Sequence, residues 1–339
     1  MHYPAAYTAA ASERDRFVLA LRDSRPRLDA WRYQDLIVEE ERTADGRIER
    51  VGTVLLTGRE CPWRCVMCDL WRGTTMDDTP RGAIPQQVAD ARQHLRDRHN
   101  DITHIKLYNA GSFFDPRAVP EDDYDAIAAH LTGFDRTIVE SHPALIGPRV
   151  DRLLASLARH ATASGAPPQL EVAMGLETVH PDALDKLNKR MTVDDFVRAA
   201  DRLRQRNVSL RVFLLISPPG VADEEQDAWL CRSVDTALAC GATAISLVPT
   251  RGGNGALEAL SATGAFREPR LEDIERSAKA ALLRRQGDGR VFVDLWDLER
   301  FSDCAACFAA RRARLQTMNL GQRPLSSAIC THCAQTADS

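Results

Sequence analysis

The sequence lacks the long apolar run that a membrane-spanning helix requires. No stretch of the 339-residue chain approaches the ~18 consecutive apolar residues that such a helix needs, so we expect no membrane partner. Its first residues also lack the basic segment and continuous apolar core of a secretory signal, which predicts a cytoplasmic protein. The chain has no internal repeat and no low-complexity segment.

The chain also lacks a strong net charge. Lys and Arg number 44 against 48 Asp and Glu, which gives a net charge of −4. This balance gives no whole-chain electrostatic reason to bind nucleic acid, although a local basic patch stays open. Hydrophobic residues make up 44% of the chain, enough to bury a sizeable core, and this excludes a disordered protein.

What the sequence has is an alternation of short β-rich runs with helix-like stretches. Six such strands separated by helices predict parallel pairing through right-handed crossovers, in a barrel or in an open doubly wound sheet. Periodicity does not choose between these two. The predicted strands are 52–56, 103–108, 136–140, 169–174, 210–216 and 242–248, with 290–295 as a further candidate. The predicted helices are 86–99, 122–131, 149–160, 192–206, 224–239 and 271–285.

The first fifty residues predict an N-terminal extension. A helix is expected over 12–22 with Ser12 as its N-cap. The apolar-rich runs 36–41 and 48–56 flank an Asp-Gly pair, which predicts a hairpin. We therefore divide the chain into an extension at 1–50, an α/β domain at 51–290 and a small Cys-rich module at 291–339.

Nine cysteines in a chain expected to stay reduced favour metal or redox chemistry over disulfides. Cys61, Cys65 and Cys68 form a C-x3-C-x2-C run directly after the first core strand, where active sites of parallel α/β folds lie. Three thiolates on one short loop suit a [4Fe–4S] cluster and leave one iron open for a small molecule. A zinc knuckle with a distant fourth ligand, or chance clustering, is the alternative.

The cysteine motif resembles that of the radical S-adenosylmethionine (SAM) superfamily, over roughly residues 50–250. This resemblance implies a partial (β/α)6 barrel of the TIM type. It also implies that the methionine part of SAM chelates the open iron. Reductive cleavage of SAM, with flavodoxin or ferredoxin as electron donor, would give a 5′-deoxyadenosyl radical that abstracts hydrogen from an organic substrate. Met67 stands where many members carry an aromatic residue.

Four further segments resemble the subgroup that contains the radical SAM subunit of archaeosine synthase, and its coproporphyrinogen oxidase and methylthiotransferase relatives. They are 106–115, 139–143, 171–177 and 187–190. These segments supply candidate contacts for SAM. Backbone carbonyls around Gly111 and Ser112 would accept from the methionine ammonium, unless the loop is only a tight turn.

The remaining candidate SAM contacts are three side chains. Glu171 would accept the ribose hydroxyls, with a salt-bridged strand glutamate as the alternative. Arg190 would clamp the carboxylate, with a surface charge as the alternative. Ser141 is expected to face the cofactor from the end of the third core strand.

Near the C-terminus, Cys304, Cys307, Cys330 and Cys333 form two C-x2-C pairs separated by 22 residues. This spacing predicts a four-thiolate metal site. Structural zinc and an auxiliary [4Fe–4S] cluster both stay open as its occupant. Between residues 300 and 333 lie five arginines and one aspartate, which suit phosphate or carboxylate binding, or else form a solvated helix face.

The sequence therefore predicts a radical SAM enzyme with two competing substrate classes. The subgroup resemblance and the Arg-rich segment slightly favour RNA or a nucleoside. The acidic net charge and the lack of a dedicated RNA-binding domain favour a small metabolite or a peptide. A non-catalytic, zinc-stabilised binding protein is the alternative from another class, but structural zinc does not need the third clustered thiol.

Overall fold

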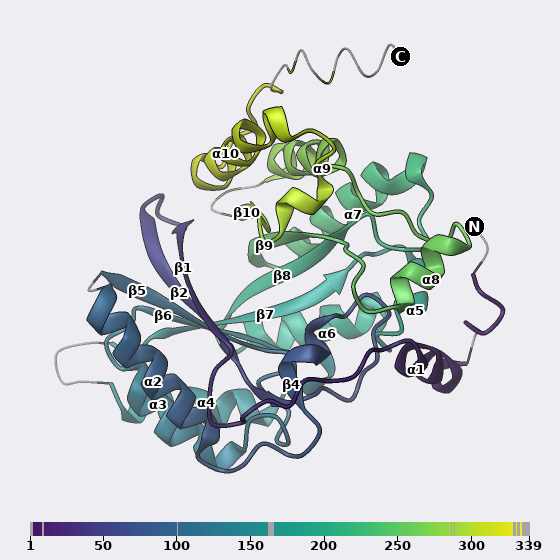
Figure 1. The fold of residues 1–339 in the computed structure, drawn as a ribbon. Coiled ribbons are helices and arrows are strands. Elements are labelled where there is room, and N and C mark those ends of the chain that lie inside the picture. The colour runs from purple at the N-terminus through teal and green to yellow at the C-terminus, as the bar shows by residue number, and fades with distance from the viewer. Residues whose placement is uncertain are drawn as a thin grey trace.

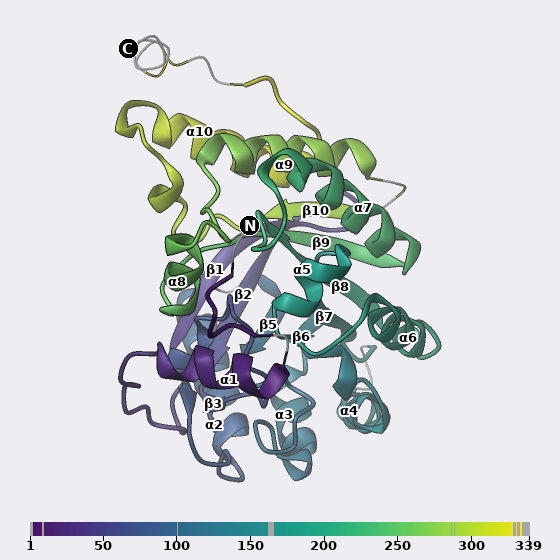
Figure 2. The same cartoon turned by 90° about the vertical axis from the view of Figure 1, so that its right-hand side faces the viewer.

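The computed structural model describes residues 3–8, 10–99, 101–161, 166–285, 287, 289–327, 330 and 333. Its main feature is an eight-stranded sheet that curls into a nearly closed barrel (Figures 1 and 2). The strand order is β1-β2-β5-β6-β7-β8-β9-β10, in which only the β1–β2 pair is antiparallel. This confirms the barrel alternative. The outer strands are β1, the first arm of the expected hairpin, and β10, the further candidate strand. The strands are β1 Asp35–Arg42, β2 Ile48–Leu56, β5 Ile102–Asn109, β6 Arg136–Glu140, β7 Gln169–Glu177, β8 Ser209–Ile216, β9 Ala242–Pro249 and β10 Arg290–Val293, with a small β3–β4 pair at Gly58–Arg59 and Thr74–Thr75.

Helices follow the parallel strands and cover the outside of the barrel (Figure 2). None of the described helices is long and apolar enough to cross a membrane. The α-helices are α1 Ala11–Ala20, α2 Ala83–Arg98, α3 Tyr124–Leu131, α4 Pro148–Arg159, α5 Pro181–Lys186, α6 Val193–Arg204, α7 Gln226–Ala239, α8 Ala256–Ala262, α9 Leu271–Arg284 and α10 Ala305–Gly321. Short 3-10 turns lie at Leu70–Gly73, Glu121–Asp123, Pro143–Leu145, Asp223–Glu225 and Leu298–Phe301.

Local signals explain several of these boundaries. Helix α6 begins at a capping box in which Thr192 and Asp195 satisfy each other's backbone N–H groups. The hairpin turn between β1 and β2 contains Gly46 at a φ of +89°, as the Asp-Gly pair predicted. The prediction for the first helix was wrong at its start. The N-cap of α1 is Ala10, without a side-chain hydrogen bond, and Ser12 lies inside the helix.

The amino-terminal end of the barrel interior is filled by a network of buried charges. Arg211 donates from Nε to Glu171 Oε1 at 2.6 Å and also pairs with Glu41. Arg136 donates to Glu171 Oε2 at 2.7 Å, and Lys106 lies 2.7 Å from Glu41. Each charge has a partner of opposite sign, which is what makes burial of such groups tolerable.

Helix α10 covers the seam where the barrel stays open, between β1 and β10. The Asn319 amide donates to Val293 O at 2.9 Å and accepts from Val293 N at 2.8 Å. Gln322 makes the same pair of bonds to Val291, at 2.7 and 2.8 Å. Two side-chain amides thus occupy the positions of a neighbouring strand. The sheet runs on past residue 290, where the domain boundary was expected, and α10 packs directly on it.

Candidate active site

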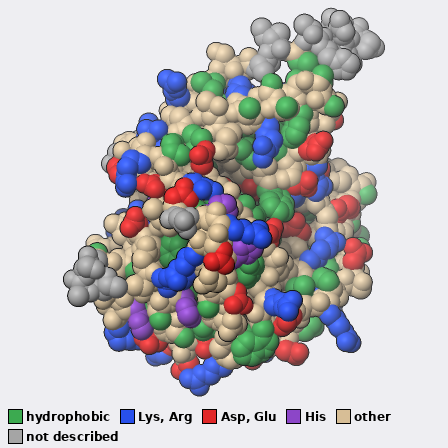
Figure 3. Space-filling model, turned by 60° about the vertical axis from the view of Figure 1, so that its left-hand side comes forward, with side chains coloured by type: hydrophobic (Ala, Val, Ile, Leu, Met, Phe, Trp, Pro, Cys, Tyr) green, Lys and Arg blue, Asp and Glu red, His purple; other side chains and the backbone are tan. Residues whose placement is uncertain are grey.

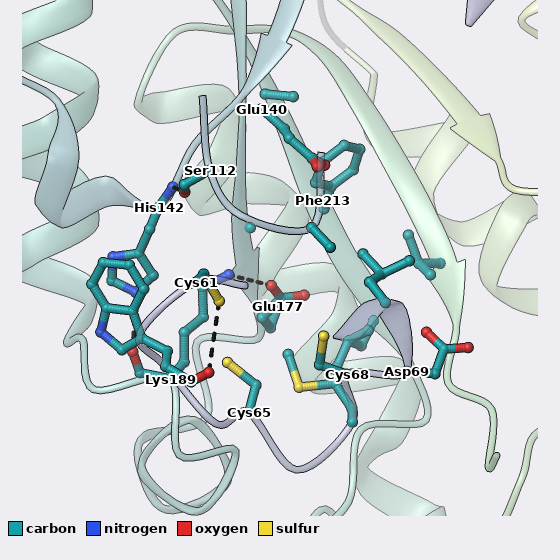
Figure 4. A pocket seen from close by; sticks show the side chains of 18 of the residues that line it. Cys61, Cys65, Cys68, Asp69, Ser112, Glu140, His142, Glu177, Lys189 and Phe213 are labelled. Atoms are coloured by element: carbon teal, nitrogen blue, oxygen red, sulfur yellow. Dashed lines mark hydrogen bonds and ion pairs between the residues drawn. The ribbon is translucent and has the colours of Figure 1, made fainter. Parts of the chain in front are cut away.

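The three clustered cysteines lie on a loop at the carboxyl end of β2, beyond the short strand β3. Cys61, Cys65 and Cys68 all line one cavity of about 250 Å³ (Figure 4). The rest of its wall comes from the carboxyl ends of the parallel strands β5 to β9, the loops after them and the turn at Lys189. The chain therefore brings three thiols, from a stretch of eight residues, to the mouth of the barrel.

The donor set and its surroundings fit an iron–sulfur cluster. Burial raises the pKa of all three thiols, that of Cys65 to about 12. Bare thiolates are therefore disfavoured, and a cationic metal group would compensate for their charge. Among the described residues, no fourth cysteine lines the cavity. A four-iron cluster held here would keep one iron without a protein thiolate.

A stacked pair of rings holds the cysteine loop against the end of β6. Trp63 lies on His142 with ring centroids 3.6 Å apart and an interplanar angle of 10°. His142 Nδ1 accepts from Ala144 N at 3.1 Å, so its proton is on Nε2, which donates to Lys189 O at 3.0 Å. Burial lowers the pKa of His142 to about 3, which keeps the ring neutral. His142 thus positions the loop.

The loop after β5 reaches the cavity through Ala110 and Ser112. Ser112 and Ser141 line it, and Ser112 Oγ accepts from His142 N at 2.7 Å. Gly111 does not line it, but a Cβ at this position would lie 2.1 Å from the Arg59 carbonyl oxygen. Only glycine fits that approach of two backbone segments.

Glu171 does not reach the cavity, so the expected ribose contact is not met. Its side chain is 0% exposed, and both carboxylate oxygens accept from the arginines of the amino-terminal network. Glu177 ends β7 six residues further along, after a break in the β7–β8 register and with a φ of +66°, and it does line the cavity. Six residues of strand correspond to about 20 Å. The glutamate at the mouth is therefore Glu177.

Arg190 is also displaced from its expected place. It does not line the cavity, and its 41% exposed side chain pairs with Asp15 of α1. Asn188 and Arg190 have φ angles of +58° and +56°, so the chain turns sharply on both sides of Lys189. Lys189 is buried, lines the cavity and forms an ion pair with Glu177 (Figure 4). The cation at this turn is Lys189.

Two polar residues away from the cysteines were missed by the sequence. Glu140 ends β6, and burial raises its pKa to about 8. Asn109 ends β5; its side-chain oxygen and nitrogen are buried and have no hydrogen-bond partner within the described chain. Both line the cavity together with Phe213, which lies beside Glu140 in Figure 4. The available signal was their position as the last residue of a strand.

The four C-terminal cysteines come together outside this cavity. Their sulfur atoms all lie within 4.8 Å of one another, although none of the four lines the cavity. Two arginines of the neighbouring Arg-rich stretch form ion pairs with glutamates of α9. Arg311 pairs with Glu272 and Glu275, and Arg314 pairs with Glu275, each at 2.6 Å. These two arginines attach α10 to α9, so they are not the free docking groups that the sequence allowed.

Comparisons with known proteins agree with this geometry. The family model described as the radical SAM superfamily matches residues 55–229. Archaeosine synthase subunit beta of Methanosarcina acetivorans is 29% identical over 67% of this chain and 66% of its own length. The protein of the same name from Thermococcus kodakarensis is 24% identical over 45% of this chain and 46% of its own. The chain thus matches just under two thirds of the first relative and about half of the second.

Among solved structures, methylornithine synthase is similar to this chain with a TM-score of 0.51 and 13% identity. The match covers 96% of this chain and 82% of that one. At this identity the likeness concerns the fold alone.

Proposed function

The chain belongs to the radical SAM superfamily and is an enzyme of that class, and from this premise we propose that it modifies RNA or a nucleoside. Cys61, Cys65 and Cys68 would hold the [4Fe–4S] cluster. When bound, the cluster and SAM supply hydrogen-abstraction chemistry, started by one electron from a donor such as flavodoxin or ferredoxin. The reaction would take place in the cytoplasm.

The chain's own residues at the mouth would bind and orient SAM. The Lys189 ammonium lies beside the cysteine loop and suits the carboxylate of the methionine part. Glu177 offers a carboxylate to hydroxyl groups, and Lys189 holds that carboxylate in place. Ser112, Ser141 and the backbone of the loop at 110–112 complete the polar wall. Trp63 and His142 fix the cysteine loop relative to these groups.

The observation that carries the substrate half of the proposal is the part of the cavity around Asn109, Glu140 and Phe213. A buried amide without a partner costs free energy unless a ligand satisfies it. Glu140, with a pKa of about 8, is largely protonated at neutral pH and can therefore donate as well as accept. An aromatic face beside mixed donors and acceptors suits a nucleobase, which an enzyme takes out of the stack to reach.

The match to archaeosine synthase subunit beta supports RNA as the carrier of that base. A small metabolite is the second candidate, and one observation favours it. On the face shown in Figure 3, basic and acidic side chains are intermixed, so that this face offers no continuous basic track for a phosphate backbone. Recognition of RNA would then depend on the cavity more than on the surface.

The test is an anaerobic reaction of the reconstituted enzyme with SAM and a reductant. One arm contains total tRNA, and the other contains an RNA-free, low-molecular-weight cell extract. We expect 5′-deoxyadenosine in excess of the no-substrate control, together with a new nucleoside mass, only in the RNA arm. A new product only in the extract arm would replace RNA by a metabolite.

A matched variant sharpens this test. Asn109→Ala removes the unpaired amide without touching a cysteine, so we expect product to fall at least tenfold while iron content stays constant. Unchanged product formation from RNA would remove Asn109 from the substrate site.

A further inference from the structure

The four C-terminal cysteines form a compact group whose sulfur–sulfur distances report on what it can hold. Cys304 Sγ lies 4.0 Å from Cys330 Sγ, and Cys307 Sγ lies 3.7 Å from Cys333 Sγ. All four sulfurs lie within 4.8 Å of one another. Sulfur atoms from the two C-x2-C pairs thus lie against one another, and the four form a single group.

These distances distinguish one metal ion from a cluster. Four sulfurs placed tetrahedrally at about 2.3 Å from a zinc ion are about 3.8 Å apart. A four-iron cluster instead puts a cube of iron and sulfide between its thiolates, which spreads them further apart. The observed 3.7 and 4.0 Å match the single ion.

The position of the group also separates it from catalysis. Cys304 is the N-cap residue of α10 and Cys307 lies in the first turn of that helix. None of the four cysteines lines the cavity that contains Cys61, Cys65 and Cys68. A catalytic metal needs an open coordination position, whereas four protein thiolates complete a tetrahedral site.

We propose that Cys304, Cys307, Cys330 and Cys333 bind one zinc ion that fixes Cys330 and Cys333 to the start of α10. The ion anchors the helix at one end, while Asn319 and Gln322 anchor it to β10 near the other. Arg311 and Arg314 attach the part between these ends to α9. The zinc site therefore supports the helix that covers the barrel seam.

The experiment measures zinc and iron per chain in the full-length enzyme after anaerobic reconstitution. The test variant is Cys330→Ser with Cys333→Ser. The matched control is Cys231→Ser with Cys240→Ser, two cysteines in or next to α7. We expect the test variant to lose one zinc and keep about four irons, and the control to keep both. Hydrogen exchange should rise over 305–321 in the test variant alone.

Each other outcome overturns part of the proposal. Loss of about four irons would show an auxiliary cluster, and loss of a single iron would show an iron site of the same shape. Unchanged zinc and iron would show no metal site at all. Zinc loss without faster exchange in α10 would overturn the supporting role.

If the test variant does not fold, the unmodified protein still decides the matter. Co²⁺ exchanged into the zinc site should give the visible spectrum of a tetrahedral thiolate centre, and absence of that spectrum would overturn the site.

Discussion

The two ends of the barrel interior both carry ionisable side chains, but those side chains are satisfied in different ways. At the amino-terminal end, Arg211, Glu171 and Glu41 neutralise one another inside the sheet. At the carboxyl end, the cysteine thiols and the Glu140 carboxyl are held in their neutral forms by burial. The Asn109 amide there has no partner among the described residues. The paired charges of the amino-terminal network hold the fold together, whereas the Asn109 amide is available to a ligand.

The largest expected effect comes from removing the thiols at the carboxyl end. Changing Cys61, Cys65 and Cys68 together to Ala removes every protein ligand of the cluster. We expect 5′-deoxyadenosine production to fall to the level of a sample without enzyme, and iron per chain to drop by about four. The folded structure should persist, as circular dichroism would show. Continued SAM cleavage in this variant would contradict the cluster assignment.

The next largest effect is a loss of stability at the amino-terminal end of the barrel interior. Arg211→Met leaves Glu171 and Glu41 buried with fewer counter-charges, which costs about 3–5 kcal/mol of unfolding free energy. Denaturant unfolding of the apoprotein measures this loss. Arg198→Met on the surface of α6 removes only an exposed pair with Asp195, so its effect should stay within about 1 kcal/mol. Equal losses in the two variants would show that burial of the network has no special role.

Removing the buried Glu140 carboxyl should stabilise the protein, whereas removing Arg211 destabilises it. The pKa of Glu140 is raised from 4.5 to about 8, so the unfolded chain releases this proton at lower pH than the folded one. Stability therefore falls as pH rises between these values, and is lower by a constant amount above them. Glu140→Gln removes this penalty, with a gain of about 4–5 kcal/mol above pH 8 and almost none near pH 4.5. Denaturant unfolding at three pH values tests this, and a gain independent of pH would contradict it.

The smallest expected effect is on SAM affinity, and it differs between two adjacent cationic residues. Lys189→Met should weaken SAM binding about 10- to 100-fold, the range expected when a hydrogen bond to a charged group is lost. Arg190→Met should change it less than about twofold, because its guanidinium pairs with Asp15 outside the cavity. Calorimetry on reconstituted protein with equal iron content provides the comparison. A larger effect at Arg190 would restore the expectation based on the sequence.

The fold was largely predictable because its signals are local. The hairpin, the alternation of strands and helices, and the cysteine loop each depend on patterns of a few residues. Barrel closure was not predictable from periodicity, since an open doubly wound sheet has the same alternation. It followed from the family resemblance, which the match over residues 55–229 confirms.

The errors at the site come from the ends of elements. Strand β7 runs three residues beyond its predicted end at Met174. The register of β7 breaks between Gly175 and Glu177, and Glu177 has a φ of +66°, so regular alternation from Glu171 does not place the Glu177 side chain. At 188–190, the two positive φ angles decide that Lys189 points inward. The residue types asparagine and arginine do not predict positive φ angles, although asparagine tolerates them.

The hydrogen bonds between the side-chain amides of Asn319 and Gln322 and the backbone of β10 have a consequence for biosynthesis. Helix α10 follows β10 in the chain, so a ribosome completes the open edge of the barrel before it completes the cover. During that interval the edges of β1 and β10 are exposed, and such edges readily pair with strands of other chains. Chains truncated before Ala305 should therefore aggregate during expression, and a chaperone that shields strand edges should raise the yield of the full-length enzyme.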